Sequence, residues 1–386
     1  MGEETQDEKE TMDRRSMLKL LVGGGLALGG AGALAGVVGS GLRGAGSVAG
    51  ASDAHEAMFY DRLPGKNVQC RLCPRGCAVG DGGRGTCGVR ENRGGSYYTL
   101  VYGTAAAVNI DPIEKKPLFH YMPGSRAFSV GTVGCNMRCK DCQNWEISQI
   151  RPEQLDRPIP LSPQTLVRKA REYDCEAVAF TYNEPTIFYE YMLDTARLAS
   201  QHGLKPVMIS NGYINREPML KLAPHLGAIK GFTTDFYNKY TGGTLEPVKM
   251  TIKRVHALGK WLEIVYLVVP TLNDDLDEIR EMARWLKRAV GPGVPLHFSR
   301  FHPAYQLTKL PSTPVSTLEK CRKAAREEGL DHVYLGNVPG HAGENTYCSS
   351  CGEVVVRRYG FHVREMHVKP NGACRFCGNK IPGVWS

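Results

Sequence analysis

Short apolar runs alternate with longer amphipathic stretches from residue 127 onward. The apolar runs are residues 128–133, 177–182, 206–210, 227–233, 262–269, 295–301 and 332–335. The amphipathic stretches are residues 163–173, 187–201, 218–222, 247–258, 276–290 and 318–328. The first of them follows Ser162, a typical N-cap residue. Strands that alternate with helices form a parallel sheet with crossover helices, so the pattern predicts an α/β fold, an open or partial (β/α)6 barrel, over residues 127–340.

Polar residues follow several of the predicted strands. In (β/α) barrels, the active-site residues lie at the C-terminal ends of the strands. At these positions, or inside the run itself, the chain carries Asn183, Glu184, Ser210, Asn211, Lys230 and His302. We therefore expect these side chains to face a common site at one end of the barrel.

Two cysteine-rich segments flank the predicted barrel. Residues 67–126 hold four cysteines, a glycine-rich loop and strand-forming residues at 96–102. Residues 341–386 hold two C-x2-C pairs around a predicted hairpin at 354–363. Residues 51–66 have the character of a linker, and residues 1–50 form a separate leader.

The leader has the features of a targeting segment. Arg14 and Arg15 precede an uncharged run at 20–42 that is rich in Gly, Ala, Leu and Val. A basic pair before an apolar run resembles a twin-arginine signal, and the run is long enough to span a bilayer. Export and an uncleaved membrane anchor both fit this pattern; a disordered Gly/Ala leader is the alternative.

Composition places the rest of the chain among globular proteins. Of its 386 residues, 42% are hydrophobic and 23% are charged. The net charge of +9 permits an anionic partner without requiring one. No basic run is interleaved with aromatic residues, which argues against nucleic-acid binding.

The thirteen cysteines indicate metal binding rather than disulfides, because all but Cys175 and Cys321 fall in three tight groups. The central group, Cys135, Cys139 and Cys142, has the spacing C-x3-C-x2-C. A [4Fe–4S] cluster normally takes four thiolates, so three would leave one iron open for chemistry. A zinc knuckle or a few buried thiols is the alternative.

The other two groups each offer four thiols. The N-terminal group is Cys70, Cys73, Cys77 and Cys87, which can hold zinc or a second iron–sulfur cluster, unless these thiols are purely structural. The C-terminal group is Cys348, Cys351, Cys374 and Cys377. Its two C-x2-C pairs predict a zinc-ribbon-like module that binds Zn²⁺, usually in a structural role.

The central spacing resembles the signature of the radical S-adenosylmethionine (SAM) enzymes, and the whole set of motifs resembles the radical SAM enzyme of the AmmeMemoRadiSam system. That family is similar to the pyruvate formate-lyase activating enzymes. The resemblance covers nearly everything from about residue 65 to the end. The residues that carry it are 70–90, 134–149, 180–186, 265–275, 297–305, 333–340 and 374–385.

The resemblance implies a TIM-like radical SAM barrel in which the open iron chelates SAM. Reductive cleavage of SAM would give a 5′-deoxyadenosyl radical that abstracts hydrogen from a protein, as in glycyl-radical activation, or from a small molecule. Reduced flavodoxin or ferredoxin would supply the electron, and other AmmeMemoRadiSam members are candidate partners. No catalytic residue is assigned beyond the cluster ligands.

The residues at the strand ends have complementary chemistry for SAM. Glu184 beside Asn183 offers acceptors for its ammonium group, and Lys230 offers a cation for its carboxylate. Ser210 and Asn211 offer short polar groups for the ribose. His302 could reach ribose or substrate.

Two positions depart from the radical SAM pattern, and they keep other functions open. Asp141 stands where an aromatic residue usually precedes the third cysteine, and Trp145 is the candidate to replace it. Ala228 stands where relatives tend to carry Asp. The alternatives are a membrane-associated iron–sulfur electron carrier or sensor, and a zinc-ribbon protein that binds RNA or another anionic partner. The leader suggests export, whereas SAM is made in the cytoplasm, so the sequence leaves the location open.

Overall fold

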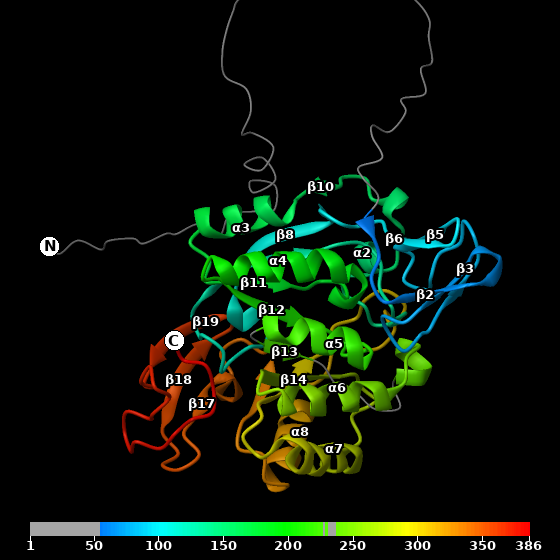
Figure 1. The fold of residues 1–386 in the computed structure, drawn as a ribbon. Helices are drawn as coiled ribbons and strands as arrows, with labels where there is room; N and C mark the ends of the chain where they lie inside the picture. Colours follow the sequence, from blue (N-terminus) through cyan, green and yellow to red (C-terminus); the bar gives the residue numbers. More distant parts are fainter. Residues whose placement is uncertain (1–54, 227, 231–236) are drawn as a thin grey trace, which may run out of the picture. The chain divides into compact units, whose positions relative to one another are not determined.

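An eight-stranded sheet organises the computed structural model, which describes residues 55–226, 228–230 and 237–386 (Figure 1). The strand order is β16-β15-β14-β13-β12-β11-β9-β8. Neighbouring strands from β9 to β16 run parallel, while β8 runs antiparallel along β9 at one edge. Their bounds are β8 Ala107–Pro112, β9 Arg126–Gly131, β11 Ala177–Phe180, β12 Lys205–Ile209, β13 Ala228–Lys230, β14 Trp261–Val268, β15 Leu296–Arg300 and β16 Val333–Gly336.

Helices connect the parallel strands in chain order. They are α2 Trp145–Ser148, α3 Pro163–Glu172, α4 Tyr189–Gln201, α5 Arg216–Leu222, α6 Leu245–Ala257, α7 Leu276–Val290 and α8 Val315–Glu327. The predicted cap is confirmed, because the Ser162 hydroxyl accepts a hydrogen bond from the Thr165 N–H. Asp275 caps α7 in the same way, through the N–H groups of Asp277 and Glu278.

The predicted apolar runs coincide with the parallel strands. Strand β11 is buried at every position, and β9 at every position after Arg126. Strands covered on both faces need continuous apolar sequence, which explains why they appear as runs rather than as alternating patterns. The fourth run is represented by β13, and the rest of 227–233 lies outside the described residues.

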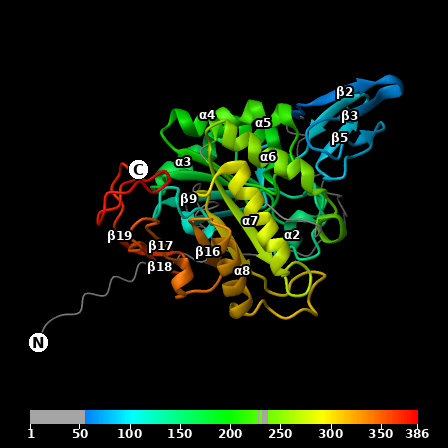
Figure 2. The same cartoon turned by 90° about the horizontal axis from the view of Figure 1, so that it is seen from below.

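Small sheets flank the central one. On the N-terminal side, β1 His55–Glu56 joins β6 Ser96–Thr99 and β5 Arg90–Arg93, and β2 Tyr60–Leu63 joins β3 Asn67–Cys70 and β4 Ala78–Val79. Strand β7 Thr104–Ala105 pairs with β10 Ile159–Pro160. The C-terminal sheet contains β17 Thr346–Tyr347, β18 Val354–Tyr359 and β19 His362–Met366. Figures 1 and 2 show the blue N-terminal sheets and the red C-terminal segment on opposite sides of the central sheet.

The segment expected to be a linker contributes to these sheets. Strands β1 and β2 lie within 51–66 and pair with β6 and β3. The predicted strand at 96–102 is shorter in the structure and ends at Thr99. The predicted hairpin around 354–363 is formed by β18 and β19 and extends to Met366.

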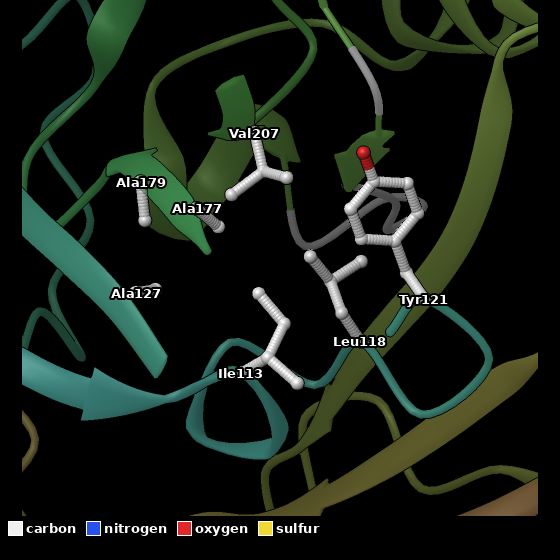
Figure 3. Packing of buried hydrophobic residues seen from close by; sticks show 7 residues of the cluster. All are labelled: Ile113, Leu118, Tyr121, Ala127, Ala177, Ala179 and Val207. Atoms are coloured by element: carbon white, nitrogen blue, oxygen red, sulfur yellow. The ribbon is translucent and has the colours of Figure 1, made fainter. Parts of the chain in front are cut away.

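A cluster of small and branched side chains fills the space beside β9, β11 and β12 (Figure 3). The connection between β8 and β9 contributes Ile113, Leu118 and Tyr121. The strands contribute Ala127, Ala177, Ala179 and Val207, all fully buried. The three alanines leave room for the larger side chains of the connection, so residues 113–121 pack directly against the sheet.

Next to this cluster lies a buried polar network around Glu263. Its carboxylate accepts hydrogen bonds from the N–H groups of Phe119 and His120 at 2.9 and 2.8 Å, and from His297 Nε2 at 2.8 Å. Phe119 O in turn accepts a 2.7 Å hydrogen bond from the buried Arg358 guanidinium of β18. The network therefore joins residues 113–121 to the sheet and to the C-terminal segment.

Among the described helices, none combines the length and the apolar character needed to cross a bilayer. The leader at 1–50, for which we predict targeting or anchoring, lies outside the described residues.

We expect Leu118→Ala to lower the free energy of unfolding by about 2–5 kcal/mol, because it removes a fully buried side chain and leaves a cavity. Leu258→Ala is the matched control: Leu258 is 40% exposed, and its loss should change stability by less than about 1 kcal/mol. Anaerobic denaturant titration of both variants measures the difference. Equal effects would show that residues 113–121 do not form part of the core.

Candidate active site

The central cysteines lie on the loop that leaves the C-terminal end of β9. This loop comes very close to the sheet and to the N-terminal segment. Gly134 has a φ of +84°, and a Cβ atom there would lie 2.5 Å from Cys87 O. Glycine is therefore the residue that allows the loop to pass against Cys87 just before Cys135.

Asn183 fixes the start of this loop. Its Oδ1 accepts a hydrogen bond from the Thr132 N–H at 3.1 Å, and its Nδ2 donates to Gly134 O at 2.9 Å. The preceding residue, Tyr182, has a φ of +73°, a left-handed conformation that costs energy in a non-glycine residue. The Tyr182 hydroxyl donates to Asp111 at 2.7 Å, which helps to hold this turn in place.

Glu184 links the end of β11 to the end of β12. Its Oε1 accepts hydrogen bonds from Ser210 Oγ at 2.7 Å and from the N–H and hydroxyl of Thr186, and its Oε2 accepts one from the Asn211 N–H at 2.7 Å. Burial raises the pKa of Glu184, although these donors oppose the increase. Glu184 also interacts electrostatically with Cys135. The structure therefore brings Glu184, Ser210 and Asn211 together beside the first cysteine.

A pair of asparagines also connects the cysteine loop to the end of β12. Asn211 Nδ2 donates to Asn136 Oδ1 at 2.9 Å, and Asn136 Nδ2 donates to Tyr213 O at 3.0 Å. Asn136 is buried although it directly follows Cys135. Hydrogen bonds between side chains thus connect the segments that follow β9, β11 and β12.

Two further segments contact the cysteine loop. Thr241 O and Tyr240 O accept hydrogen bonds from the N–H groups of Arg138 and Lys140, at 2.8 and 2.9 Å. The Gln306 N–H donates to Lys140 O at 3.0 Å. These contacts come from the segment before α6 and from the loop after β15, so the cysteine loop is held from several sides.

Trp145 lies at the start of α2 and is 41% exposed. Its ring stacks on Tyr305, with 5.4 Å between the ring centroids and an interplanar angle of 14°. The structure thus places an aromatic pair beside the cysteine loop.

The three thiols sit in an environment that disfavours their charged forms. Burial raises the pKa of Cys135 to about 12, and Glu184 adds to the increase. Burial also raises the pKa of Cys139 well above its usual value, with a further contribution from Asp141. A metal binds the thiolate, so loading this site would release protons.

Asp141 is held in the same buried region. Burial raises its pKa to about 6. Its Oδ1 atom is buried and has no hydrogen-bond partner within the described part of the chain. The loop therefore presents an unsatisfied acceptor between its second and third cysteines.

The remaining candidates are less fully defined. Lys230 ends β13 opposite Ile209 and Glu263, and Ala228 begins this strand, but their side chains lie outside the described part of the structure. His302 follows β15 and is exposed, and its Nδ1 lies 3.1 Å from Ser312 Oγ.

The C-terminal cysteines are arranged as ligands of one metal ion. The sulfur atoms of Cys348, Cys351, Cys374 and Cys377 all lie within 4.8 Å of one another. The Cys348–Cys377 and Cys351–Cys374 sulfur pairs are 3.6 and 3.9 Å apart. Tetrahedral zinc with Zn–S bonds of about 2.3 Å would place its sulfurs about 3.8 Å apart, which these distances match.

The N-terminal cysteines lie close to the central loop. Besides the Cys87–Gly134 contact, Arg75 Nε donates to Asn136 O at 2.8 Å, and the Arg138 guanidinium donates to Thr86 O. The Asn215 N–H after β12 donates to Leu72 O at 3.1 Å. The N-terminal cysteine set is thus packed against the ends of the same strands.

Several residues that make these contacts are not among those predicted from the sequence. Gly134, Arg75 and Asn136 each stand next to, or between, cysteines in the motifs. Their position beside the cysteines is the sequence feature that could identify them. Gln306 contacts the loop through its backbone, and Tyr240 through its backbone and its ring, whose centroid lies 5.4 Å from Lys140 Nζ. No sequence motif points to either residue.

Comparison with known proteins identifies the superfamily of the central domain. Residues 129–286 match the radical SAM superfamily. The uncharacterized protein MJ0808 of Methanocaldococcus jannaschii is 46% identical over 330 residues, which are 84% of this chain and 98% of that protein. The pyruvate formate-lyase-activating enzyme of Clostridium pasteurianum is 28% identical over 176 residues, 43% of this chain and 71% of that enzyme. A solved domain of the pyruvate-formate lyase-activating enzyme of Bacteroides vulgatus aligns with a TM-score of 0.37 and 16% identity, over 42% of this chain and 99% of that domain.

The chain therefore belongs to the same family as MJ0808 and, through residues 129–286, to the radical SAM superfamily. Superfamily membership supports radical chemistry that begins with SAM cleavage at an iron–sulfur cluster. Radical SAM enzymes generally receive their electrons from flavodoxin or ferredoxin.

We expect Gly134→Ala to destabilise the protein more than Gly203→Ala. Both glycines have a left-handed φ, +84° and +77°, so both substitutions incur roughly 1–2 kcal/mol of backbone strain. Only at Gly134 would the new methyl group meet other atoms, Cys87 O at 2.5 Å and Val89 Cγ1 at 2.6 Å, whereas nothing lies within 4 Å at Gly203. Thermal unfolding of the two variants compares them; an equal loss would show that the Cys87 contact is not held in solution.

Proposed function

We propose that the chain is a radical SAM enzyme whose [4Fe–4S] cluster is ligated by Cys135, Cys139 and Cys142. The observation that carries this proposal is the convergence of three thiols with the polar groups that end β11 and β12. Glu184 is near enough to Cys135 to raise its pKa, and Asn211 reaches the residue that follows Cys135. Chelation of SAM requires one open iron, and the buried carboxylate of Glu184 would lie beside it as a hydrogen-bond acceptor.

The donor set fits this cofactor. Three soft sulfur ligands on one loop suit iron or zinc rather than a hard cation. The Met137 N–H lies 3.4 Å from Cys135 Sγ, and Ser148 Oγ lies 3.1 Å from Cys142 Sγ, so both sulfurs have donors that stabilise thiolate charge. When bound and reduced, the cluster supplies the electron that cleaves SAM to methionine and a 5′-deoxyadenosyl radical.

The chain's own residues would bind and orient SAM. Glu184 Oε2 accepts a hydrogen bond from the Asn211 N–H and retains capacity to accept another from the SAM ammonium group. Asn183 acts indirectly, by fixing the loop that carries Cys135. Ser210 and Asn211 are candidates for the ribose, Lys230 for the carboxylate, and His302 for ribose or substrate.

Hydrogen abstraction from a protein is the favoured reaction. The similarity to a pyruvate formate-lyase-activating enzyme supports a protein substrate, and glycyl-radical formation is the specific form of this proposal. Abstraction from a small molecule is the alternative. Other members of the AmmeMemoRadiSam set remain the proposed partners.

The C-terminal module would have a structural role in this enzyme. We assign Zn²⁺ to Cys348, Cys351, Cys374 and Cys377 because their sulfur separations match a tetrahedral ion. The module also supplies Arg358, which holds Phe119 in the core. Its metal would therefore stabilise residues 113–121 from outside the sheet.

We expect Cys139→Ala to abolish production of 5′-deoxyadenosine, because two thiolates cannot retain the central cluster. The assay uses anaerobically reconstituted, reduced protein with SAM, together with iron analysis. Cys175→Ala is the control, since Cys175 is a buried thiol outside the three groups. Wild-type protein with intact iron, no 5′-deoxyadenosine and no spectral change on adding SAM would instead indicate an electron carrier or sensor.

We expect Glu184→Gln to weaken SAM binding by roughly 10- to 100-fold, because a hydrogen bond to a charged group contributes about 1.5–3 kcal/mol. The amide preserves the shape of the side chain but replaces one accepting oxygen by a donor, so iron analysis of the same sample separates loss of the SAM contact from loss of the cluster. Equilibrium titration of SAM, followed by the cluster spectrum, measures the effect. Unchanged affinity would exclude Glu184 as a SAM contact.

A further inference from the structure

The two four-cysteine sets differ in geometry. The C-terminal sulfurs lie within 4.8 Å of one another, as a single ion requires. In the described part of the chain, no three sulfurs of Cys70, Cys73, Cys77 and Cys87 meet this distance. A cubic cluster holds its ligands farther apart than a single ion does, because each sulfur binds a different iron.

The N-terminal thiols nevertheless form one group. The Cys70 N–H donates to Cys77 O at 2.9 Å, the Gly76 N–H donates to Cys73 O at 3.1 Å, and Cys73 interacts electrostatically with Cys70, Cys77 and Cys87. Cys70 and Cys73 are buried, whereas Cys77 and Cys87 are half-buried. The four thiols therefore lie near one another, but not as close together as the ligands of one ion.

Two buried donors beside these cysteines have no hydrogen-bond partner within the described residues. They are Arg90 Nε and the Tyr97 hydroxyl, both in fully buried side chains. The Arg90 guanidinium forms a buried ion pair with Glu190, and its charge also interacts with Cys70 and Cys87. Tyr97 interacts with Cys87, Cys70 and Cys77, and a Cβ atom on Gly85 would lie 2.7 Å from the Tyr97 hydroxyl and 3.6 Å from Cys77 Sγ. An unpartnered buried donor is costly, and the sulfides and thiolates of a cluster are acceptors that would satisfy both.

The contacts with the central loop provide a short path between the two cysteine sets. Cys87 O would lie 2.5 Å from a Cβ atom on Gly134, which directly precedes Cys135. Arg138, one residue before Cys139, donates to Thr86 O, one residue before Cys87. Because electron tunnelling falls steeply with distance, this contact between the two loops favours transfer between centres that they hold.

We propose that Cys70, Cys73, Cys77 and Cys87 ligate a second [4Fe–4S] cluster that relays electrons to the central one. A reduced flavodoxin or ferredoxin loses one electron to the second cluster, which then loses one electron to the central cluster; no bond is formed and no proton is transferred. Thr86 is exposed and Cys77 is half-buried, so an external donor protein can approach this side. The relay, though not the metal assignment, rests on the proposed function.

Metal analysis of the full-length chain tests the assignment. After anaerobic reconstitution, we expect about eight iron atoms per chain, four for each cluster, and one zinc. The double variant Cys70→Ser/Cys73→Ser should lose half of the iron and keep the zinc, which also shows that the C-terminal module is intact. Cys175→Ser should change neither metal. About four iron atoms in the wild type, with zinc that is lost on changing Cys70 and Cys73, would overturn the proposal.

Reduction kinetics test the relay. In the Cys70→Ser/Cys73→Ser variant, flavodoxin should reduce the central cluster at least tenfold more slowly, while the small reductant dithionite reduces it as before. An unchanged rate with flavodoxin would overturn the relay. Eight iron atoms without cleavage of SAM would reject the proposed function and support the metal assignment.

Tyr97→Phe distinguishes a cluster from a purely structural thiol group or a zinc site, because neither of these has a reduction potential that could shift. It removes the hydroxyl donor and preserves the ring, so it should lower the reduction potential of the second cluster alone, because hydrogen bonds to sulfur tune cluster potentials. Redox titration followed by electron paramagnetic resonance separates the two clusters. No shift in either potential would argue against a cluster beside Tyr97.

Discussion

The hydrogen bonds made by Asn183 and Glu184 are the interactions on which the candidate site depends. Asn183 binds the backbone before Cys135, and Glu184 binds the end of β12. Both residues follow β11, the strand between β9 and β12, so this short turn fixes the ends of its two neighbours. Because Tyr182 adopts a strained conformation there, the turn is maintained by its surroundings rather than by local preference.

The two ends of the central sheet use polar groups differently. At the C-terminal ends of β9, β11 and β12, polar groups surround a loop with three thiols. Near the start of β14, Glu263 is enclosed by donors and serves to attach residues 113–121. Between them, Ala127, Ala177 and Ala179 form an apolar layer. This layer separates the end of the sheet that carries the candidate site from the end where Glu263 stabilises the fold.

The sequence predicts the parallel strands, the N-cap at Ser162 and the grouping of the cysteines, because each depends on a local pattern of residues. It does not predict that β1 and β2 arise within an apparent linker, since their stability comes from pairing with β6 and β3. It places Glu184 at a strand end, but not the donors that surround it. Tyr240 and Gln306 also make backbone hydrogen bonds to the cysteine loop. Backbone groups are the same in every residue, so only the structure reveals these contacts.

The attachment of residues 113–121 also governs when the protein can complete its fold. Phe119 binds Arg358, and His120 binds the carbonyl of Pro382, so their partners lie 239 and 262 residues away. During synthesis, these early residues leave the ribosome long before their partners exist. Domains usually fold as they emerge, but this core stays incomplete until Arg358 and Pro382 have been made. An interrupted chain would therefore expose apolar surface, which chaperones and proteases recognise.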